Sequence, residues 1–289
     1  MRSSLVGSLI ALINVASSLA EEQGVKLNKS RFSIFNPTPD SLRRAYNTDR
    51  PSKTDSPFTI DAGVFQIETD AFSWTVDRNN PSDLNVRIRI LSAGQTNFKI
   101  GLTNWMDLQI IPQGYVERRT SGSDFGEPLE QGGFGDTTLR LKINLVGNEG
   151  RKFVAGLVTS LKMPTNRDHL GNSVYEPGLA LPINVSLPAG FTFFGQTRID
   201  VLDTAASSDR RLLWSNPVGL SRTIAGKLSG YAEFYSAVSS RDGYPWIGTV
   251  DLGLIYQVAP NFSIDVNAFI GVTESADDLN VFTGFACRF

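Results

Sequence analysis

Few residues of this sequence could carry out covalent chemistry. His169 is the only histidine and Cys287 is the only cysteine. A Ser/His nucleophilic pair needs a histidine as its base. His169 lies in the polar stretch 166–171, which predicts an exposed loop. A hydrolase built on His169 is therefore the weakest interpretation, and we predict that the protein is not an enzyme.

Metal and cofactor chemistry has equally little support. One cysteine can form neither an intramolecular disulfide nor a cysteine-based metal cluster. Asp124, Glu127, Glu130 and Asp136 offer oxygen ligands for calcium, but their spacing matches no known binding loop. The glycine-rich run at 132–135 lacks the lysine and the helical context of a phosphate-binding loop. We predict no metal and no cofactor.

The informative charged residues lie on the polar faces of amphipathic segments. A basic set falls on the second, fourth and fifth predicted strands, and an acidic set falls on the ninth to eleventh. If the strands close into a barrel, the two sets face each other and create a transverse field across a narrow bore. An equal alternative is that they neutralise one another and close the interior. The lumen-lining candidates are Arg87, Arg89, Arg140, Lys142, Lys162, Arg198, Asp200, Glu233, Asp251 and Asp265.

The elements that position these charges have the period of β-strands. From Leu84 to Leu102, large apolar residues recur on even positions while Arg87, Arg89 and Lys99 fall on odd ones. Side chains of a strand alternate between its two faces, so this stretch predicts one continuous amphipathic strand in which Gly94 keeps the phase. Similar segments follow as far as the C-terminus and give about twelve strands.

These segments predict an all-β fold, a transmembrane antiparallel up-and-down β-barrel. Many are near the ten residues that a tilted membrane strand needs. Their connections alternate in length, which predicts short periplasmic turns and longer extracellular loops. A soluble β-sandwich also alternates. However, nearly every segment is amphipathic, and aromatic residues such as Trp74, Trp105 and Trp246 gather near segment ends, as a membrane-interface girdle requires.

The last ten residues predict the closing strand of the barrel. Val281, Thr283, Phe285, Cys287 and Phe289 share one face, which is apolar to the end of the chain. An open apolar edge recruits other chains, whereas pairing with the first strand removes the edge. We predict that this strand, with Phe285 and Phe289, pairs with Phe58–Thr69. Cys287 is predicted to be a small lipid-facing or interfacial hydrophobic side chain.

The N-terminal part has a different composition. A short apolar run followed by small residues predicts a signal peptide over residues 1–20. Residues 21–57 are polar and rich in proline, and predict a periplasmic N-terminal extension or plug; an unstructured leader is an equal alternative. The barrel is predicted over 58–289. The formal net charge of −2 shows no basic excess, so we expect no nucleic-acid partner.

Several motifs carry a family resemblance that covers nearly all of the mature chain. In order, they are residues 47–57 running into 61–69, then 99–103, 133–136, 161–165 and 251–254. Together they resemble the outer-membrane transporters grouped under a meta-pathway phenol-degradation heading. Ser52 and Asn166 depart from the family's usual residues. The resemblance implies a channel for small, hydrophobic or aromatic compounds, and Phe289 is similar to the aromatic end that barrel-assembly machinery reads.

The sequence therefore predicts a monomeric barrel in the outer membrane of a Gram-negative-type bacterium. Its expected partners are the lipid bilayer, the barrel-assembly machinery and a small-molecule solute that passes passively through a narrow charged lumen. The alternative is a closed structural or surface-binding barrel.

Overall fold

The computed structural model describes residues 28–78, 86–122, 127–204 and 207–289. The predicted signal peptide and Asp124 lie outside these residues. No helix in the described part of the chain is long and apolar enough to cross a membrane.

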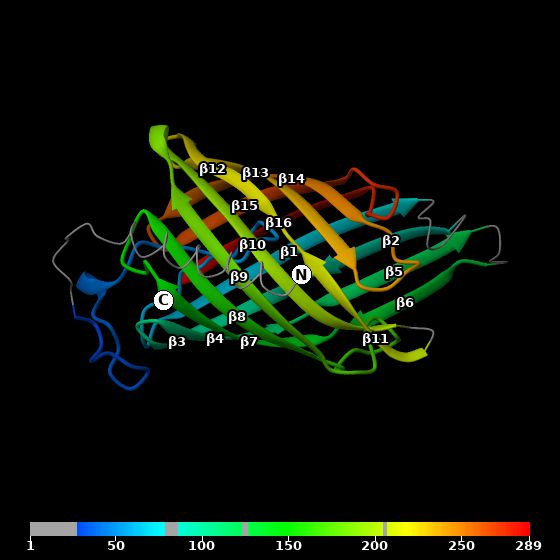
Figure 1. The fold of residues 1–289 in the computed structure, drawn as a ribbon, viewed down its shortest axis with the longest axis horizontal. Helices are drawn as coiled ribbons and strands as arrows, with labels where there is room; N and C mark the ends of the chain where they lie inside the picture. Colours follow the sequence, from blue (N-terminus) through cyan, green and yellow to red (C-terminus); the bar gives the residue numbers. More distant parts are fainter. Residues whose placement is uncertain (1–27, 79–85, 123–126, 205–206) are drawn as a thin grey trace, which may run out of the picture.

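Antiparallel strands form a single sheet that closes on itself (Figure 1). Four wall strands are each interrupted once, at the β2–β3, β4–β5, β6–β7 and β11–β12 junctions, so the closed barrel has twelve strands and the predicted fold class is confirmed. The strands are β1 (Phe65–Arg78), β2 (Val86–Ala93), β3 (Gln95–Thr103), β4 (Met106–Pro112), β5 (Tyr115–Gly122), β6 (Leu129–Phe134), β7 (Thr137–Val146), β8 (Phe153–Met163), β9 (Glu176–Ser186), β10 (Phe191–Thr204), β11 (Ser207–Ser215), β12 (Val218–Ala225), β13 (Leu228–Ser239), β14 (Ile247–Ala259), β15 (Phe262–Gly271) and β16 (Leu279–Arg288).

The barrel closes between its first and last strands, as predicted. β1 and β16 pair from Gln66 opposite Arg288 to Val76 opposite Leu279. The predicted start at Phe58 is wrong, because β1 begins at Phe65. The backbone N–H groups of Thr59 and Ile60 instead donate to the side chains of Asn148, in the β7–β8 turn, and Asp107, on β4. Beyond Phe58, backbone pairing with the wall begins only at Gly63 and Val64, which exchange hydrogen bonds with Gly101 of β3.

Short turns and longer connections lie at opposite ends of the barrel (Figure 1). Two predicted loops are largely strand: residues 118–134 form most of the β5–β6 hairpin, and 203–210 belong mainly to β10 and β11. Both segments lack an alternating apolar face, which is the signal on which the prediction depended. Pairing beyond the lipid needs only backbone hydrogen bonds, so these strands leave no such pattern.

The two faces of the wall differ in polarity. Outward-facing residues such as Leu252, Ile264 and Val266 are exposed, although they are large and apolar. Inward-facing residues such as Lys142 and Asp251 are fully buried, although they are charged. A polar interior surrounded by an apolar outer belt is the arrangement of a barrel that is dissolved in lipid.

Glycines mark a level at which side chains change face. Gly94 has φ 79°, and its N–H donates to the carbonyl oxygen of Asp70, next to a bulge in β1. On the neighbouring strand a Cβ at Gly114 would collide with the carbonyl oxygen of Ala93. The prediction that Gly94 keeps the phase is therefore wrong: Lys99 of β3 points inward, whereas odd-numbered residues of β2 point outward.

Candidate functional site

The bore holds the N-terminal chain. We call residues 47–60 the bore segment; it follows the 3-10 turn η1 (Asp40–Leu42) at the short-turn end of the barrel (Figure 1). The segment has no helix or strand of its own, so wall side chains satisfy its backbone. The Asn144 amide, for example, donates to the carbonyl oxygen of Pro57 at 2.9 Å.

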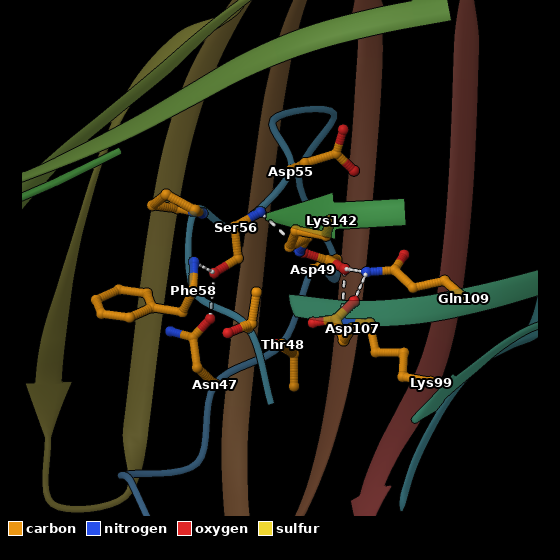
Figure 2. Close-up of polar contacts among 12 residues, drawn as sticks. Asn47, Thr48, Asp49, Asp55, Ser56, Phe58, Lys99, Asp107, Gln109 and Lys142 are labelled. Carbon is orange, nitrogen blue, oxygen red and sulfur yellow. Dashed lines mark hydrogen bonds and ion pairs between the residues drawn. The ribbon is translucent and has the colours of Figure 1, made fainter. Parts of the chain in front are cut away.

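Asp49 makes the most buried ion pair of this segment, because its partner Lys142 is 0% exposed. Its carboxylate accepts from the ammonium groups of Lys142 and Lys99, the latter at 2.6 Å. Figure 2 shows the Gln109 side chain pointing at the same carboxylate, to which its amide donates at 3.3 Å. Asp49 also accepts from the backbone N–H of Ser56 at 2.9 Å. Two cations and two neutral donors therefore hold one anion.

The charge of Asp49 is fixed by these partners. Burial alone would raise the pKa of its carboxyl, but the ammonium groups of Lys142 and Lys99 outweigh burial and hold the pKa well below its usual range. Asp49 is therefore ionised at any neutral or mildly acidic pH, and the attraction to both lysines is present throughout.

Arg50 points to the opposite wall. Its guanidinium donates to Asp265 through Nη2 at 2.7 Å and through Nε at 3.1 Å, and it also pairs with Asp70. The two bonds to Asp265 make a bidentate pair, which is the strong geometry for arginine and carboxylate. Adjacent residues of the segment thus contact walls of opposite charge.

Lys53 and Thr54 extend the contact with the acidic wall. Lys53 Nζ lies 3.2 Å from Asp251 Oδ2 and donates to Thr249 Oγ1 at 2.6 Å. The backbone N–H groups of Lys53 and Thr54 both donate to the carboxylate of Glu233, at 2.9 and 3.0 Å. Burial lowers the pKa of the Lys53 ammonium, and the nearby Asp251 carboxylate opposes that shift.

Asp55 returns to the basic wall. Arg140 Nη1 donates to its carboxylate at 2.9 Å, and Arg198 Nη1 lies 3.7 Å from the other oxygen. The backbone N–H of Asp55 donates to Gln196 Oε1 at 3.0 Å. The segment therefore alternates between the two walls. Its acids contact the basic wall and its bases contact the acidic wall.

The charged side chains of the wall form two arcs, one mainly basic and one mainly acidic. The basic arc has Lys99, Arg140, Lys142, Lys162 and Arg198 on strands β3 to β10, and the acids Asp107, Glu176 and Asp200 lie within it. The acidic arc has Glu233, Asp251 and Asp265 on β13 to β15, and Glu68 and Asp70 on β1, beyond β16. The bore segment places Asp49 and Asp55 against the first arc and Arg50 and Lys53 against the second, so its charge pattern complements the wall.

Most of the predicted lumen residues lie on the inner face. Lys162 pairs with Glu176 at 2.5 Å, near the longer connections, and Arg198 pairs with Asp200 at 2.7 Å. Their role in lining a conducting pore stays a prediction. Arg87 and Arg89 do not belong to this group: both are exposed and lie on the outer face, because β2 changes phase at Gly94.

Sequence reasoning missed the residues that join wall and segment. Glu68 and Lys99 are almost fully buried on the inner face, and they pair with each other beside Asp49. Lys99 already stood on the polar side of its predicted strand. A signal for the bore segment was also available in the sequence. A segment that faces two oppositely charged walls must carry charges of both signs, and Asp49, Arg50, Lys53 and Asp55 do so.

The bore segment divides the interior into two cavities. A loop-side cavity of about 410 Å³ reaches Asp136 and Lys162, and a turn-side cavity of about 350 Å³ reaches Gly190 and Gln257. Arg50, Pro51, Ser52 and Asp55 line both. These residues are therefore the partition between the two ends of the bore.

Each cavity also has aromatic side chains from the inner wall. Phe269 and Phe282 line the loop-side cavity with their rings edge to face and 4.8 Å apart. Phe194 and Tyr231 line the turn-side cavity at 6.2 Å. The Tyr231 hydroxyl is buried and has no hydrogen-bond partner among the described residues. Both cavities thus combine aromatic surface with charged or hydroxyl groups.

The candidates for other chemistry are dispersed. His169 is exposed in the connection between β8 and β9. Asp136 is buried, and its oxygens accept from the backbone N–H groups of Thr165, Asn166 and Asn172, with the Lys162 ammonium 4.0 Å away. The described residues contain no group of three or more His, Cys, Asp or Glu side chains placed to hold a metal ion.

A closed antiparallel wall with an apolar outer face and a charged interior defines an outer-membrane β-barrel protein. The chain belongs to the family described as "MetA-pathway of phenol degradation", whose model matches residues 48–289. The predicted family resemblance is therefore confirmed. A search among curated proteins gives no match.

Two solved barrels show the likeness in fold. The COG4313 outer membrane channel from Pseudomonas putida F1 is 14% identical, with a TM-score of 0.59 over 84% of this chain and 100% of that one. The translocator domain of the autotransporter NalP from Neisseria meningitidis is 13% identical, with a TM-score of 0.53 over 83% of this chain and 90% of that one. At these identities the likeness concerns the fold alone.

Proposed function

We propose that the protein is a passive outer-membrane channel for small solutes and that the bore segment holds it closed. The observation that carries this proposal is that Arg50, Pro51 and Ser52 line both cavities. If the segment leaves its site, the two cavities become one passage. The lumen-lining candidates on the inner face, and Glu68 and Lys99 with them, would then border the solute.

The proposed solutes are small aromatic compounds with a polar or ionised group. The aromatic pairs Phe269–Phe282 and Phe194–Tyr231 offer ring contacts at both ends of the bore. The charged arcs offer partners for the polar group. The family heading, phenol degradation, supports the same solute class.

The orientation follows from the loops. Outer-membrane barrels place their short turns in the periplasm and their longer loops outside. The bore segment would then enter from the periplasmic end, close to Phe289, whose backbone N–H donates to the carbonyl oxygen of Phe65. Recognition of Phe289 by assembly machinery and a monomeric state remain predictions.

The test compares solutes in liposomes that contain the full-length protein or its Asp49→Asn/Arg50→Gln variant. Benzoate and cyclohexanecarboxylate have the same charge and differ mainly in aromaticity. We expect liposomes with the wild-type protein to swell slowly in both solutes. Liposomes with the variant should swell fast, and several-fold faster in benzoate than in cyclohexanecarboxylate. Asp40→Asn is the matched control, because the Asp40 side chain is 87% exposed.

The result also decides between a channel and a closed structural or surface-binding barrel. If a correctly folded variant passes neither solute, the closed barrel is the better interpretation. If it passes both equally, the channel stands and the aromatic solute class is wrong. A variant that retains the heat-modifiable gel migration of a folded barrel meets the folding condition.

A further inference from the structure

An arginine cluster lies on the outer face of the barrel, above the glycine level. It consists of Arg78 on β1, Arg87 and Arg89 on β2, and Arg119 on β5. Arg78 is directly opposite Arg87, and Arg89 is directly opposite Arg119. Directly opposed residues have Cβ atoms about 4.5–5.5 Å apart, and like charges at that position repel. Two such pairs side by side make a bound anion favourable.

The protein's own acids provide little compensation. Arg78 Nε is 3.8 Å from Asp278, and Arg119 Nη1 is 3.6 Å from Glu130, with arginine side chains 59% and 55% exposed. Arg87 and Arg89 are exposed and make no hydrogen bond or ion pair within the described part of the chain. Glu117 is exposed on the same face, but no ion pair joins it to a described residue.

The position of the cluster relates it to the membrane. Trp74 and Tyr115 occupy the same outer face, four residues before Arg78 and Arg119 in their strands. Tyr115 packs edge to face against Phe134 at 5.8 Å. Such aromatic residues mark the membrane interface. Four residues span about 13 Å along a strand, or about 10 Å of height at the usual tilt, which is just beyond the lipid headgroup layer of about 5–8 Å. Extended arginine side chains can reach back into that layer.

We infer that the arginine cluster binds the phosphate groups of lipid A, the phosphorylated glycolipid of the outer leaflet. Arginine forms bidentate bonds to phosphate, and a phosphate between opposed guanidinium groups would relieve their repulsion. The cluster continues directly from the lipid-facing belt of the same strands, so an outer-leaflet lipid is the occupant that the position favours. Since these side chains point away from the bore, the binding is independent of the proposed channel.

The experiment measures binding of bisphosphorylated lipid A to the full-length protein in neutral detergent, by native mass spectrometry. Dephosphorylated lipid A with the same acyl chains is the lipid control. We expect wild type to bind the phosphorylated form at least tenfold more tightly, and this preference should weaken as salt increases. Equal binding of the two lipids would overturn the inference without the need for any variant.

The variant Arg87→Gln/Arg89→Gln should lose most of that preference and keep its bilayer conductance unchanged. The matched control is Arg222→Gln, an exposed arginine near the short-turn end, which should bind like wild type. An equal loss in Arg222→Gln would show non-specific attraction. Binding of inorganic phosphate as tight as that of phosphorylated lipid A would show a general anion site. A dimer that dissociates in the double variant would show a second copy of the chain as the occupant. Each of these three results would contradict the inference.

Discussion

The two charged arcs hold the bore segment in different ways. The basic arc holds the segment most deeply at Asp49, between Lys142 and Lys99, whose side chains are 0% and 3% exposed. Its second contact, between Arg140 and Asp55, is less buried, because the Arg140 side chain is 22% exposed. The acidic arc holds the segment through several contacts, with Arg50, Lys53 and backbone N–H donors. The Lys53 side chain is 25% exposed. A buried charge without its partner is costly, whereas a partly hydrated one is not. We therefore expect the basic arc to decide whether the segment stays docked.

Removing the anion at the basic arc should have the largest effect. In Asp49→Asn, the buried ammonium group of Lys142 loses its carboxylate and Lys99 keeps only Glu68. Removing one partner of a buried ion pair typically costs about 3–5 kcal/mol. Hydrogen-exchange protection of the amides in residues 47–60 should fall by at least about 10²-fold, since each 1.4 kcal/mol is tenfold. Protection in the barrel strands should change little. Asp40→Asn should leave protection at the wild-type level, and an equal fall in both variants would contradict this ranking.

Removing the arginine at the acidic arc should have a smaller effect. Arg50→Gln loses charge-assisted hydrogen bonds to Asp265 and Asp70, for which we expect a loss of about 2–3 kcal/mol of docking free energy. A double-mutant cycle with Asp265→Asn should give a coupling of about 1–2 kcal/mol. Strictly additive effects in the same exchange measurement would mean that this pair does not hold the segment.

Lys53→Met should have the smallest effect of the substitutions. The Lys53 ammonium is partly hydrated, and its burial already lowers its pKa. Methionine can retain packing against Tyr235 and Phe269, whose ring centroids lie 4.4 Å from Lys53 Nζ. Lys53 itself is partly hydrated, but the Asp251 carboxylate is 0% exposed and loses its cation, so we expect a loss of about 1–2 kcal/mol. A change as large as that of Asp49→Asn would show that both arcs hold the segment equally.

Mild acid should not release the segment. Because the folded-state pKa of Asp49 is lowered, its stabilising contribution is complete above the ordinary carboxyl value of about 3.9 and is lost as pH falls through that value toward the folded pKa. Protection of residues 47–60 should therefore be the same at pH 8 and pH 5 and should fall below about pH 4. Release near pH 6 would exclude Asp49 as the controlling group.

The barrel and the charged arcs could be predicted from the sequence, because both depend on the alternation of apolar and polar residues along a strand. Lys142, Glu233 and Asp251 stood on the polar sides of amphipathic strands, and closure turns that side inward. The apolar face of the last strand likewise predicted closure against β1. These inferences use only the period of two and the hydrogen-bonding needs of a membrane wall.

The remaining features depend on contacts that alternation does not encode. One bulge in β1 and the left-handed Gly94 exchange the faces of β2, which moves Arg87 and Arg89 from the predicted lumen to the outer surface. The bore segment has no period at all, because its position is set by individual side chains of distant strands, such as Glu233 for Thr54. The start of β1 at Phe65 follows from the same contacts.

Single-channel recording tests the central claim most directly, which is that the segment docked between the two arcs closes the bore. Full-length wild type and Asp49→Asn/Arg50→Gln would be compared in the same planar bilayer. We predict at most brief, small openings for wild type, and long openings of larger conductance for the variant. A variant that is folded and as closed as wild type, or a wild type already open at the variant's conductance, would contradict the account.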